Sequence, residues 1–481
     1  MAFNLKNTFL VLITASVIDA ASFFTFQRPI FGGILLLTAA LATFIFSLRS
    51  PTVGLAIVIF ELLVGSQGHL FVLPISGFNF SIRMALFTAL LVGWATRMLV
   101  QKKLPRINLS FAPLFILLGV GLAQGIINND SNVVFFDVNG WLFFLLLPVF
   151  LSVPWQSLHR ILVVPFVAAT GYLALKTIVL LPLFSFGIIS IGDPFYRWIR
   201  VTGTGEITYI SGTLFRIFTQ SQIFLTLGVA IAGAIILLNW KQWSAKLRFL
   251  SLGYLLLITT ALLISQSRSF WVGGLTALLF TTGVLIWQKR LTITGALTGG
   301  GVLVLIVIAG SLLLQLASGS LGGNPIANRF SGFDREPAGM SRISQLQPLG
   351  EAIFQHLLVG YGFGKTLTYV SSDPRIVATH PGGIYTTYAF EWGYLDIMLK
   401  IGLLGLLAYA WIIFKQAKEL WQRAESAVAW GLFSALLAIT VTNIFSPYLN
   451  HPLGIGFILL VAVAVQKTGF NARATQLKTT P

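Results

Sequence analysis

Long apolar runs follow one another along almost the whole chain, and most are separated by only a few polar residues. About fourteen of them approach the ~20 residues that a helix needs to cross the hydrocarbon core of a bilayer. The runs are unbroken, whereas a membrane β-barrel would show ~10-residue segments of alternating polarity. The pattern predicts an all-α polytopic membrane protein of about 12–14 transmembrane helices, forming one membrane domain over residues 1–481. The predicted spans lie at roughly 9–26, 30–48, 52–72, 84–100, 111–127, 141–154, 161–183, 217–239, 249–264, 270–287, 291–316, 394–414, 426–445 and 452–466.

Two of these runs need comment. The run at 141–154 is short and contains Pro148, which favours a tilted or re-entrant segment. The first run, from Phe9 to about Phe26, lacks a small-residue cleavage site and is followed directly by another span. We therefore expect it to be the first helix rather than a removed signal peptide.

Composition agrees with the pattern. The chain is 56% hydrophobic and 9% charged, which leaves too little polar surface to cover a soluble fold. It contains no cysteine, so disulfides and thiolate chemistry are excluded.

One long polar interruption, residues 317–392, separates the last three predicted spans from the others. We expect it to form a large outer loop that carries short helices. Its side chains include several that are suited to binding phosphate, and two that could act as a base. These residues are Arg329, Arg335, Arg342, Lys365, Arg375, His380 and Glu391.

Clusters of basic residues join four pairs of predicted spans. They are Arg97/Lys102/Lys103/Arg106, Lys241/Lys246/Arg248, Lys289/Arg290 and Lys415/Lys418/Arg423. Because cytoplasmic loops collect Lys and Arg, all four are assigned to the cytoplasm, which places both termini inside and residues 317–392 outside. This bias accounts for most of the formal net charge of +17. A nucleic-acid partner is not expected, since no basic stripe with interleaved aromatic residues lies on a soluble domain.

The predicted outer side is rich in arginine and carries one lysine, Lys365. Its arginines are Arg28, Arg83, Arg197, Arg200, Arg216, Arg268, Arg329, Arg335, Arg342 and Arg375. The planar guanidinium grips phosphate bidentately, whereas lysine offers a hydrated point charge. The group therefore suggests a phosphate-bearing ligand that is reached from outside. The alternative for any one arginine is a salt bridge to an outer carboxylate, at Asp130, Asp137, Asp193, Glu206, Asp334, Glu336, Glu351 or Asp373.

Two of the arginines stand at the mouths of predicted spans. Arg268 lies in the hinge ISQSRSFWVGG (264–274), and Arg216 lies in GTLFRIFTQSQ (212–222). A charge near hydrocarbon costs roughly 2.5–3.5 kcal/mol and tends to be retained for function. Together the two side chains could clamp a diphosphate and stabilise it as a leaving group. The alternative is that both snorkel to the membrane surface.

Metal and cofactor chemistry is not expected. The sequence contains neither DxD nor HExxH, and its histidines are scattered, at His69, His356, His380 and His451 among others. A transferase that uses a soluble nucleotide sugar would usually need a metal-binding carboxylate pair. Arginines can neutralise a diphosphate without one.

Three segments, in order and with matching topology, resemble the O-antigen ligase and O-antigen polymerase superfamily. They are SRSFW (267–271), SRISQLQPLGEAIFQHLLVGYGFG (341–364) and EWGYLDIMLKIGLLG (391–405), within a region of roughly residues 200–410. The resemblance implies an enzyme of the bacterial inner membrane that transfers a glycan from a polyprenyl diphosphate lipid, with inversion and without a metal. Residue by residue, it places Arg268 on the family's hinge arginine, Arg216 on an arginine before an earlier span, and Arg342 on the loop arginine.

One position departs from the family pattern. Ligases of the superfamily have His-Asn where this chain has Glu391-Trp392, and the nearest histidine is His380. We expect Glu391 to take the proton from an acceptor hydroxyl, with His380 as the alternative base. The competing interpretations are a salt bridge for Glu391 and an ordinary loop position for His380. The residues expected to bind donor or acceptor are Arg329, Arg335, Arg342 and Lys365.

Three functions stay open at this stage. Polymerases of the superfamily are less strict at the departing position, which favours a polymerase whose acceptor is another lipid-linked repeat unit and whose further partner is a chain-length regulator. The second is a ligase that attaches finished glycan to lipid A core, another glycolipid or a protein. The third is a transporter of small anions, with Lys176, Asp396 and Lys400 forming an ion path. Against the transporter, the sequence has no internal repeat, and Asp396 and Lys400 also fit an intrahelical pair.

Overall fold

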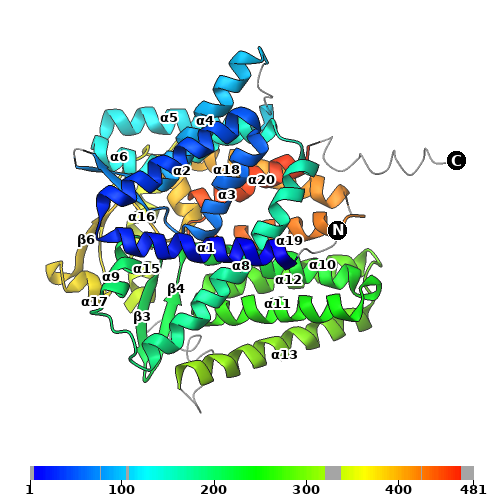
Figure 1. Ribbon diagram of the computed structural model, residues 1–481. Helices are drawn as coiled ribbons and strands as arrows, with labels where there is room; N and C mark the ends of the chain where they lie inside the picture. Colours follow the sequence, from blue (N-terminus) through cyan, green and yellow to red (C-terminus); the bar gives the residue numbers. More distant parts are fainter. Residues whose placement is uncertain (1–4, 76, 104–107, 320–336, 424, 467–481) are drawn as a thin grey trace.

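The computed structural model describes residues 5–466 apart from 76, 104–107, 320–336 and 424, and it confirms an all-helical membrane fold (Figure 1). Within the described residues, ten helices are long and apolar enough to cross a membrane, two of them with the help of flanking 3₁₀ turns. These helices are α1 (Leu5–Phe26), α2 (Pro29–Arg49), α4 (Ile82–Val100), α5 (Ala112–Asn128), α8 (Trp155–Ser185), α10 (Ile223–Asn239), α11 (Ala245–Ile264), α12 (Arg268–Trp287), α13 (Ile293–Ser318) and α18 (Gly393–Gln422).

The other four predicted spans are helical but do not form simple spans. Three are shorter apolar helices, α3 (Pro51–Val64), α19 (Ala427–Thr442) and α20 (Pro452–Ala464). The fourth, at 141–154, is part of a broken element, in which α6 (Ser131–Val138) meets η2 (Trp141–Leu146) and α7 (Leu147–Leu151) at an angle of 49°. Counting that element as one span gives eleven. The expected 12–14 helices are thus ten or eleven candidate spans plus three shorter helices.

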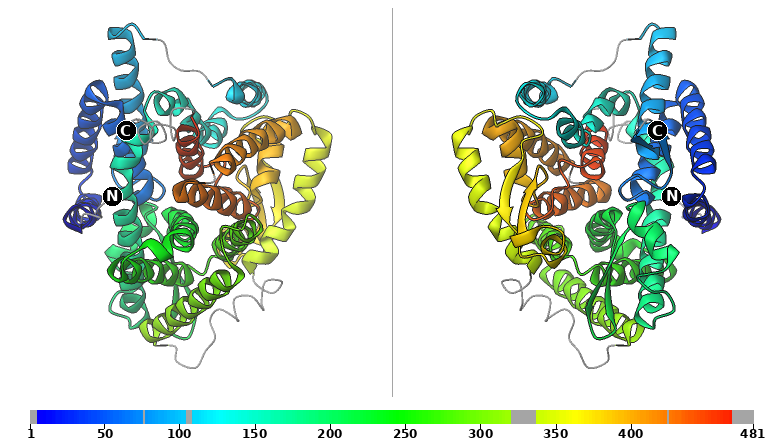
Figure 2. Two further views of the ribbon diagram at one scale, coloured as in Figure 1. Left: turned by 90° about the vertical axis from the view of Figure 1, so that its right-hand side faces the viewer. Right: turned by 90° about the vertical axis from the view of Figure 1, so that its left-hand side faces the viewer.

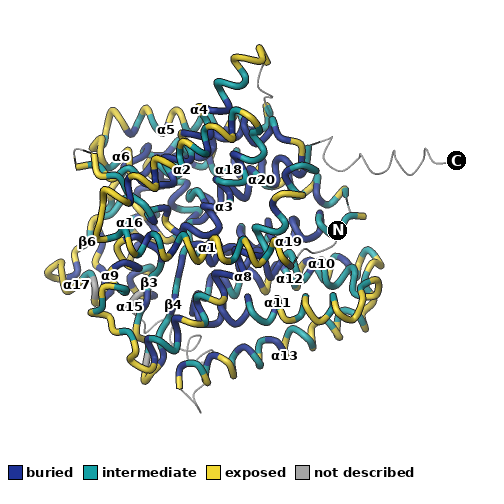
Figure 3. Tube along the Cα trace, in the orientation of Figure 1, coloured by how far each residue is buried: buried dark blue, intermediate teal, exposed yellow. Residues whose placement is uncertain are grey.

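The short helices lie at the centre of the molecule and several long ones at its edge. Almost every residue of α20 is buried, and so is most of α19. By contrast, α1, α2 and α13 lie at the edge of the bundle and expose Leu, Ile and Phe side chains (Figures 2 and 3). In a membrane protein such side chains face lipid, whereas a helix too short to reach both surfaces needs protein around its ends. The short helices are therefore the buried ones, and the long helices at the edge carry the side chains that face lipid.

Three antiparallel hairpins and several short helices gather at one end of the bundle, on the left in Figure 1. The hairpins are β1–β2 (Val72–Ile75, Phe78–Ser81), β3–β4 (Glu206–Ser211, Leu214–Phe218) and β5–β6 (Leu367–Val370, Ile384–Thr387). The short helices are α9 (Pro194–Val201), α15 (Pro337–Ser344), α16 (Leu346–Gln355), α17 (Pro374–Val377) and η5 (Pro381–Gly383). All but α9 belong to the segment expected to form a loop with short helices, which also carries the hairpin β5–β6.

Arginines at the opposite end of the bundle cap the carboxyl ends of helices. The Arg97 guanidinium donates to the carbonyls of Leu48 and Arg49 at the end of α2. Arg423 does the same for the carbonyls of Ala464 and Val465 at the end of α20. A cation at this position satisfies carbonyls that have no partner within the helix and opposes the helix dipole.

The other two basic clusters, Lys241/Lys246/Arg248 and Lys289/Arg290, follow the ends of α10 and α12. Arg248 donates to the Trp240 carbonyl just after α10 (2.9 Å), and Trp287 of α12 packs on Trp421 of α18 with ring centroids 6.3 Å apart. The first contact joins the start of α11 to the end of α10, and the second joins the ends of α12 and α18. The common side of all four clusters stays a prediction.

Candidate functional site

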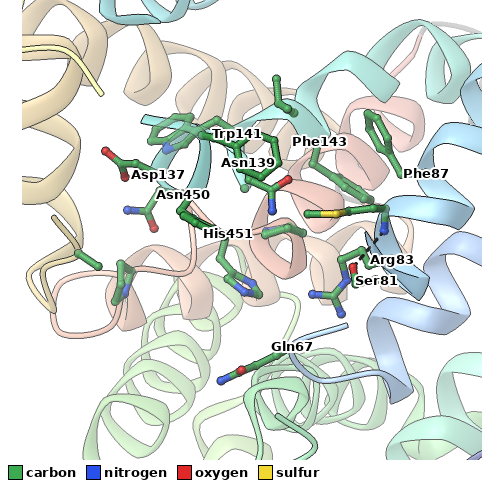
Figure 4. A pocket seen from close by; sticks show the side chains of 18 of the residues that line it. Gln67, Ser81, Arg83, Phe87, Asp137, Asn139, Trp141, Phe143, Asn450 and His451 are labelled. Atoms are coloured by element: carbon green, nitrogen blue, oxygen red, sulfur yellow. Dashed lines mark hydrogen bonds between the residues drawn. The ribbon is translucent and has the colours of Figure 1, made fainter. Parts of the chain in front are cut away.

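A cavity of about 860 Å³ lies where the short and broken helices end (Figure 4). Its wall is formed by the link after α3, the start of α4, the break between α6 and η2, the start of α18, and the loop between α19 and α20. Each of these backbone interruptions is surrounded by protein. Irregular backbone at membrane depth is tolerated in such a place, because other protein groups or cavity water can satisfy its hydrogen bonds.

Long-range hydrogen bonds hold these helix ends in place. Beyond the end of α3, the Ser221 hydroxyl donates to the Leu62 carbonyl (2.9 Å) and accepts the Ser66 N–H (3.0 Å). Before α20, the Leu449 carbonyl accepts the Tyr409 hydroxyl (2.8 Å). Polar side chains from distant parts of the sequence thus replace the bonds that a continuous helix would make.

The GYGFG sequence at 360–364 supports the acidic end of the cavity. It packs against a break in α18 at Gly402, whose φ of 70° and ψ of −177° are not helical. The Gly362 N–H donates to the Lys400 carbonyl (3.1 Å), and the Leu403 N–H donates to the Leu357 carbonyl (2.8 Å). A Cβ atom at Gly402 would lie 2.2 Å from the Leu358 carbonyl oxygen, so only glycine fits there. This packing fixes the segment of α18 that carries the charged residues.

At that end, Lys400 is shared by two buried carboxylates. Its Nζ lies 2.5 Å from Asp137 Oδ1 and 2.8 Å from Asp396 Oδ2. Asp137 Oδ2 accepts the Gly364 N–H (2.8 Å), and Asp396 Oδ2 also accepts the Asn450 amide. Buried charges are stable only when they are paired and hydrogen-bonded. Two carboxylates and one ammonium leave this cluster with one unmatched negative charge.

At the other end of the cavity in Figure 4, Arg83 forms a matched pair with Glu61. Its Nε and Nη2 lie 2.9 Å and 3.0 Å from the two carboxylate oxygens, and Nη2 also donates to the Ser66 carbonyl (2.8 Å). Both side chains are buried. The bidentate geometry is the strong form of this interaction, so the pair adds no net charge to the cavity.

Two histidines line the cavity in neutral form. Burial, and then the positive charge of Arg83, lower the pKa of His451 to about 3, and the same two causes lower the pKa of His69. His451 Nδ1 accepts the Leu453 N–H at the start of α20 (3.3 Å), so the ring proton is on Nε2. Figure 4 places the His451 ring between the acidic end and Arg83. It is suited to donate a hydrogen bond to a ligand oxygen.

The remaining wall combines aromatic rings with amides. The rings belong to Phe78, Phe80, Phe87, Phe135, Phe136, Trp141, Phe143, Tyr388 and Phe390, and the amides to Gln67, Asn132, Asn139, Gln220 and Asn450. Rings offer flat apolar faces, and amides both donate and accept hydrogen bonds. With no net positive charge, the cavity suits an uncharged ligand with many hydroxyl groups better than an anion.

The side chain of Arg216, which lies in strand β4 and not at the mouth of a helix, reaches the segment just before Arg268, the first residue of α12. Arg216 Nε donates to the carbonyl of Ser265, three residues before Arg268 (2.9 Å). The Arg216 guanidinium also lies over the Phe218 ring, 4.6 Å from its centroid, and that ring stacks on Phe270. Neither arginine belongs to the cavity wall. The ring stack connects Arg216 with the wall, because Tyr448, which packs on Phe270, donates to the carbonyl of the wall residue Gln220 (3.2 Å).

The other predicted site residues that the structure describes, Arg342, Lys365, His380 and Glu391, lie in the loop region and outside the cavity wall. Glu391 forms a salt bridge with Arg342 and is half exposed. Trp392 fixes this pair, since its Nε1 donates to the Arg342 carbonyl (2.9 Å). His380 is exposed, and its Nδ1 lies 2.9 Å from the Thr379 hydroxyl.

Three further predictions concern two lysines and the arginines at 329 and 335. Lys365 lies over the Tyr361 ring, 4.3 Å from its centroid. Arg329 and Arg335 fall outside the described residues. Lys176 forms an ion pair with Asp19, whereas Lys400 pairs with Asp137 and Asp396. Within the described residues the two lysines therefore belong to separate charge clusters.

Several residues of the cavity were not singled out from the sequence. Arg83 and Asp137 were grouped only by their predicted side, and His69 and His451 only as scattered histidines. The available signal was local: Glu61, Arg83 and Asp137 are charges within or directly beside apolar segments, where ionisable residues face protein or a cavity. That signal marks individual residues and does not show which of them meet.

Comparison with known proteins adds no family assignment, because no family model matches the chain and no characterised protein is similar to it in sequence. The chain is a polytopic all-helical membrane protein with ten or eleven candidate spans.

Proposed function

We propose that this protein is an inverting, metal-independent glycan transferase that uses a polyprenyl-diphosphate-linked glycan as donor and a sugar hydroxyl as acceptor. The observation that carries the proposal is the pairing of two different environments. A wide cavity with aromatic and amide walls and no net positive charge is connected, through Gln220, Tyr448 and Phe270, to the segments that carry Arg216 in β4 and Arg268 at the start of α12. A lipid-linked glycan has the same two parts, an uncharged sugar chain and a diphosphate.

In this proposal the sugars of donor and acceptor occupy the cavity. Their hydroxyls bind Asn139, Asn450 and Gln67, and their apolar faces lie on rings such as Trp141. Arg216 and Arg268 bind the diphosphate and stabilise the charge that develops as it leaves. A preorganised donor of this kind contributes about 10²–10³-fold to the rate of comparable reactions. Arg342, Arg329, Arg335 and Lys365 would bind parts of the donor or acceptor that extend into the loop region.

The proposed setting is a bacterial inner membrane, with the hairpin-bearing end outside. This orientation is supported by Arg97 and Arg423, which cap helices at the opposite end, because cytoplasmic loops are rich in Lys and Arg. The resemblance of residues 267–271, 341–364 and 391–405 to the O-antigen ligase and polymerase superfamily supports the same setting. The two later segments meet at the Arg342–Glu391 pair, and both contribute to the acidic end of the cavity.

We favour a polymerase, with a second lipid-linked repeat unit as acceptor and a chain-length regulator as partner. The departure from His-Asn at Glu391-Trp392 supports it over a ligase. The two differ in cells: loss of a polymerase leaves single repeat units on the final carrier, whereas loss of a ligase leaves long glycan on the polyprenyl lipid. Deleting the gene in its native host and separating lipid-linked from transferred glycan distinguishes them. Unchanged glycan in both fractions would contradict both.

A specific observation keeps a transporter as the second candidate. Helices are broken at Gly402 and between α6 and η2, and these breaks lie near a cavity with buried charges. Many transporters bind ions at broken helices of this kind. A transporter predicts that purified protein in vesicles moves a small anion across the bilayer and makes no glycan product. A transferase predicts the reverse.

A further inference from the structure

Asp137 and Asp396 share Lys400, but their remaining oxygens differ. Both oxygens of Asp137 are engaged, one by Lys400 and one by the Gly364 N–H. Asp396 directs Oδ2 to Lys400 and Asn450, whereas Oδ1 makes no hydrogen bond of normal geometry to a described residue. The backbone N–H of Phe390 also donates to this carboxylate. Asp396 is 1% exposed and belongs to the cavity wall. It is therefore a buried carboxylate of the cavity wall, and its Oδ1 has no side-chain partner among the described residues.

The net charge of the Asp137–Asp396–Lys400 cluster also favours a hydrogen-bond donor at Asp396. Lys400 balances one carboxylate, and the second negative charge has no counter-charge among Arg83, His69 and His451. Arg83 is matched by Glu61, and both imidazoles are neutral for the reasons given above. A buried, unmatched carboxylate is stabilised by a donor group or by a proton. A ligand hydroxyl supplies both.

The other groups that could accept a proton are less well placed. The low pKa of His451 makes it a weak base. Glu391 is paired with Arg342, and His380 is exposed. Neither Glu391 nor His380 belongs to the cavity wall, whereas Asp396 does.

We propose that Asp396 is the general base of the reaction, with Asp137 and Lys400 as its positioning residues. The proposal rests on the glycan-transferase function proposed above. The acceptor hydroxyl donates its hydrogen bond to Asp396 Oδ1. Its oxygen forms a bond to the anomeric carbon of the donor, and the bond from that carbon to the diphosphate oxygen breaks. The diphosphate leaves with the bonding electrons, held by Arg216 and Arg268, while the hydroxyl proton passes to Asp396.

One loop connects the base with the arginines. Asn450 binds Asp396, and Ser446, four residues earlier, lies 2.9 Å from the hydroxyl of Ser269, next to Arg268. Four residues span at most about 14 Å. The loop therefore connects the Asp396 side of the cavity with the segment that carries Arg268.

The experiment measures transfer by purified full-length protein with a polyprenyl-diphosphate-linked oligosaccharide, together with binding of that donor. Asp396→Asn should lower the transfer rate by about 10²–10⁴-fold while donor binding changes less than about threefold. Asp137→Asn removes the same charge from the same cluster but leaves Oδ1 of Asp396, so it should lose less than about tenfold. Glu419→Gln is the matched control, because Glu419 also pairs with a basic residue four positions later on α18 but lies at the far end of the helix. It should keep wild-type activity.

Activity is expressed per monodisperse protein, and Asp396→Ala is assayed with and without formate. Partial rescue by formate is expected, since formate can occupy the vacated position and accept the proton. Wild-type activity in Asp396→Asn, or loss of activity in Glu391→Gln with Asp396→Asn still active, would overturn the assignment. Failure of both Asp396 variants to fold would overturn it as well, because Asp137 would then not suffice to balance Lys400. If wild type and Glu419→Gln both lack transfer activity, the proposed function fails instead.

Discussion

Lys400 is the residue on which the charge balance of the cavity depends. It is the only cation within hydrogen-bond distance of Asp137 and Asp396 in the part of the chain that the structure describes. Removing one carboxylate leaves a neutral pair, but removing the lysine leaves two buried negative charges. Substituting one carboxylate should therefore change the chemistry of the cavity, whereas substituting Lys400 should impair folding.

Lys400→Met should destabilise the protein by about 3–5 kcal/mol, the usual effect of leaving buried charges unpaired. Thermal unfolding in detergent, followed by tryptophan fluorescence or by loss of the monodisperse peak, measures this. Lys418→Met, on the exposed side of the same helix, is the control and should unfold like wild type. Equal stability of all three proteins would show that the cluster is not buried as described.

His451 should make the fold sensitive to acid. Burial and Arg83 lower its pKa to about 3 in the folded state, against 6.5 for an unperturbed histidine. The unfolded chain therefore binds an extra proton between these values, and stability falls as the pH is lowered from about 6.5 toward 3. By pH 5 this loss reaches at most about 2 kcal/mol.

His451→Asn tests this directly. Asparagine can also cap the start of α20 through its side-chain oxygen, but it does not titrate. The difference in unfolding temperature between pH 7 and pH 5 should be smaller for this variant than for wild type. His356→Asn, at an exposed position, should leave that difference unchanged. An identical acid response in wild type and His451→Asn would rule out the histidine as its cause.

At the scale of elements, the break in α18 holds the charged residues in place. The left-handed φ of Gly402 and its contact with the Leu358 carbonyl exclude a side chain. Gly402→Ala should cost about 3 kcal/mol or more or prevent folding, since neighbouring backbone would have to move. Gly283→Ala in α12 is the matched control, because a Cβ there meets nothing within 4 Å. Expression and thermal unfolding of the two variants should differ, and similar behaviour would argue against the break.

Which elements could be foreseen from the sequence depends on how local their cause is. Each apolar run is a helix, because hydropathy and helix formation act over one segment. That α3 stops at Val64 depends on Ser221, more than 150 residues away in the chain. Likewise Arg268 could be placed at the start of a helix, whereas Arg216, predicted at a helix mouth, lies in strand β4. Their connection to a cavity bounded by Asp396 and His451 depends on where the α19–α20 loop packs, and no local pattern shows this.

At the scale of the whole molecule, the two ends of the bundle should face opposite sides of the membrane. Basic clusters cap helices at one end, and residues 337–392 lie at the other. A phosphatase reporter inserted at Gly339 should be active, and one inserted at Lys289 or fused to the C-terminus should be inactive. Reporters that respond to the cytoplasm should give the reverse pattern. The same signal at Gly339 and Lys289 would contradict this topology and the proposed access to the site from outside.

The central claim is that the cavity, together with Arg216 and Arg268, transfers a lipid-linked glycan. The most direct measurement is glycan synthesis by the purified protein in liposomes that contain a polyprenyl-diphosphate-linked oligosaccharide as the only substrate. The account predicts a ladder of longer glycans and released polyprenyl diphosphate. It also predicts a rate about 10²-fold lower for Arg268→Lys, since lysine keeps the charge but not the planar grip. Arg290→Lys, at the opposite end of α12, should match wild type. No product from a folded wild-type protein supplied with donor and acceptor, or equal rates for Arg268→Lys and wild type, would contradict the account.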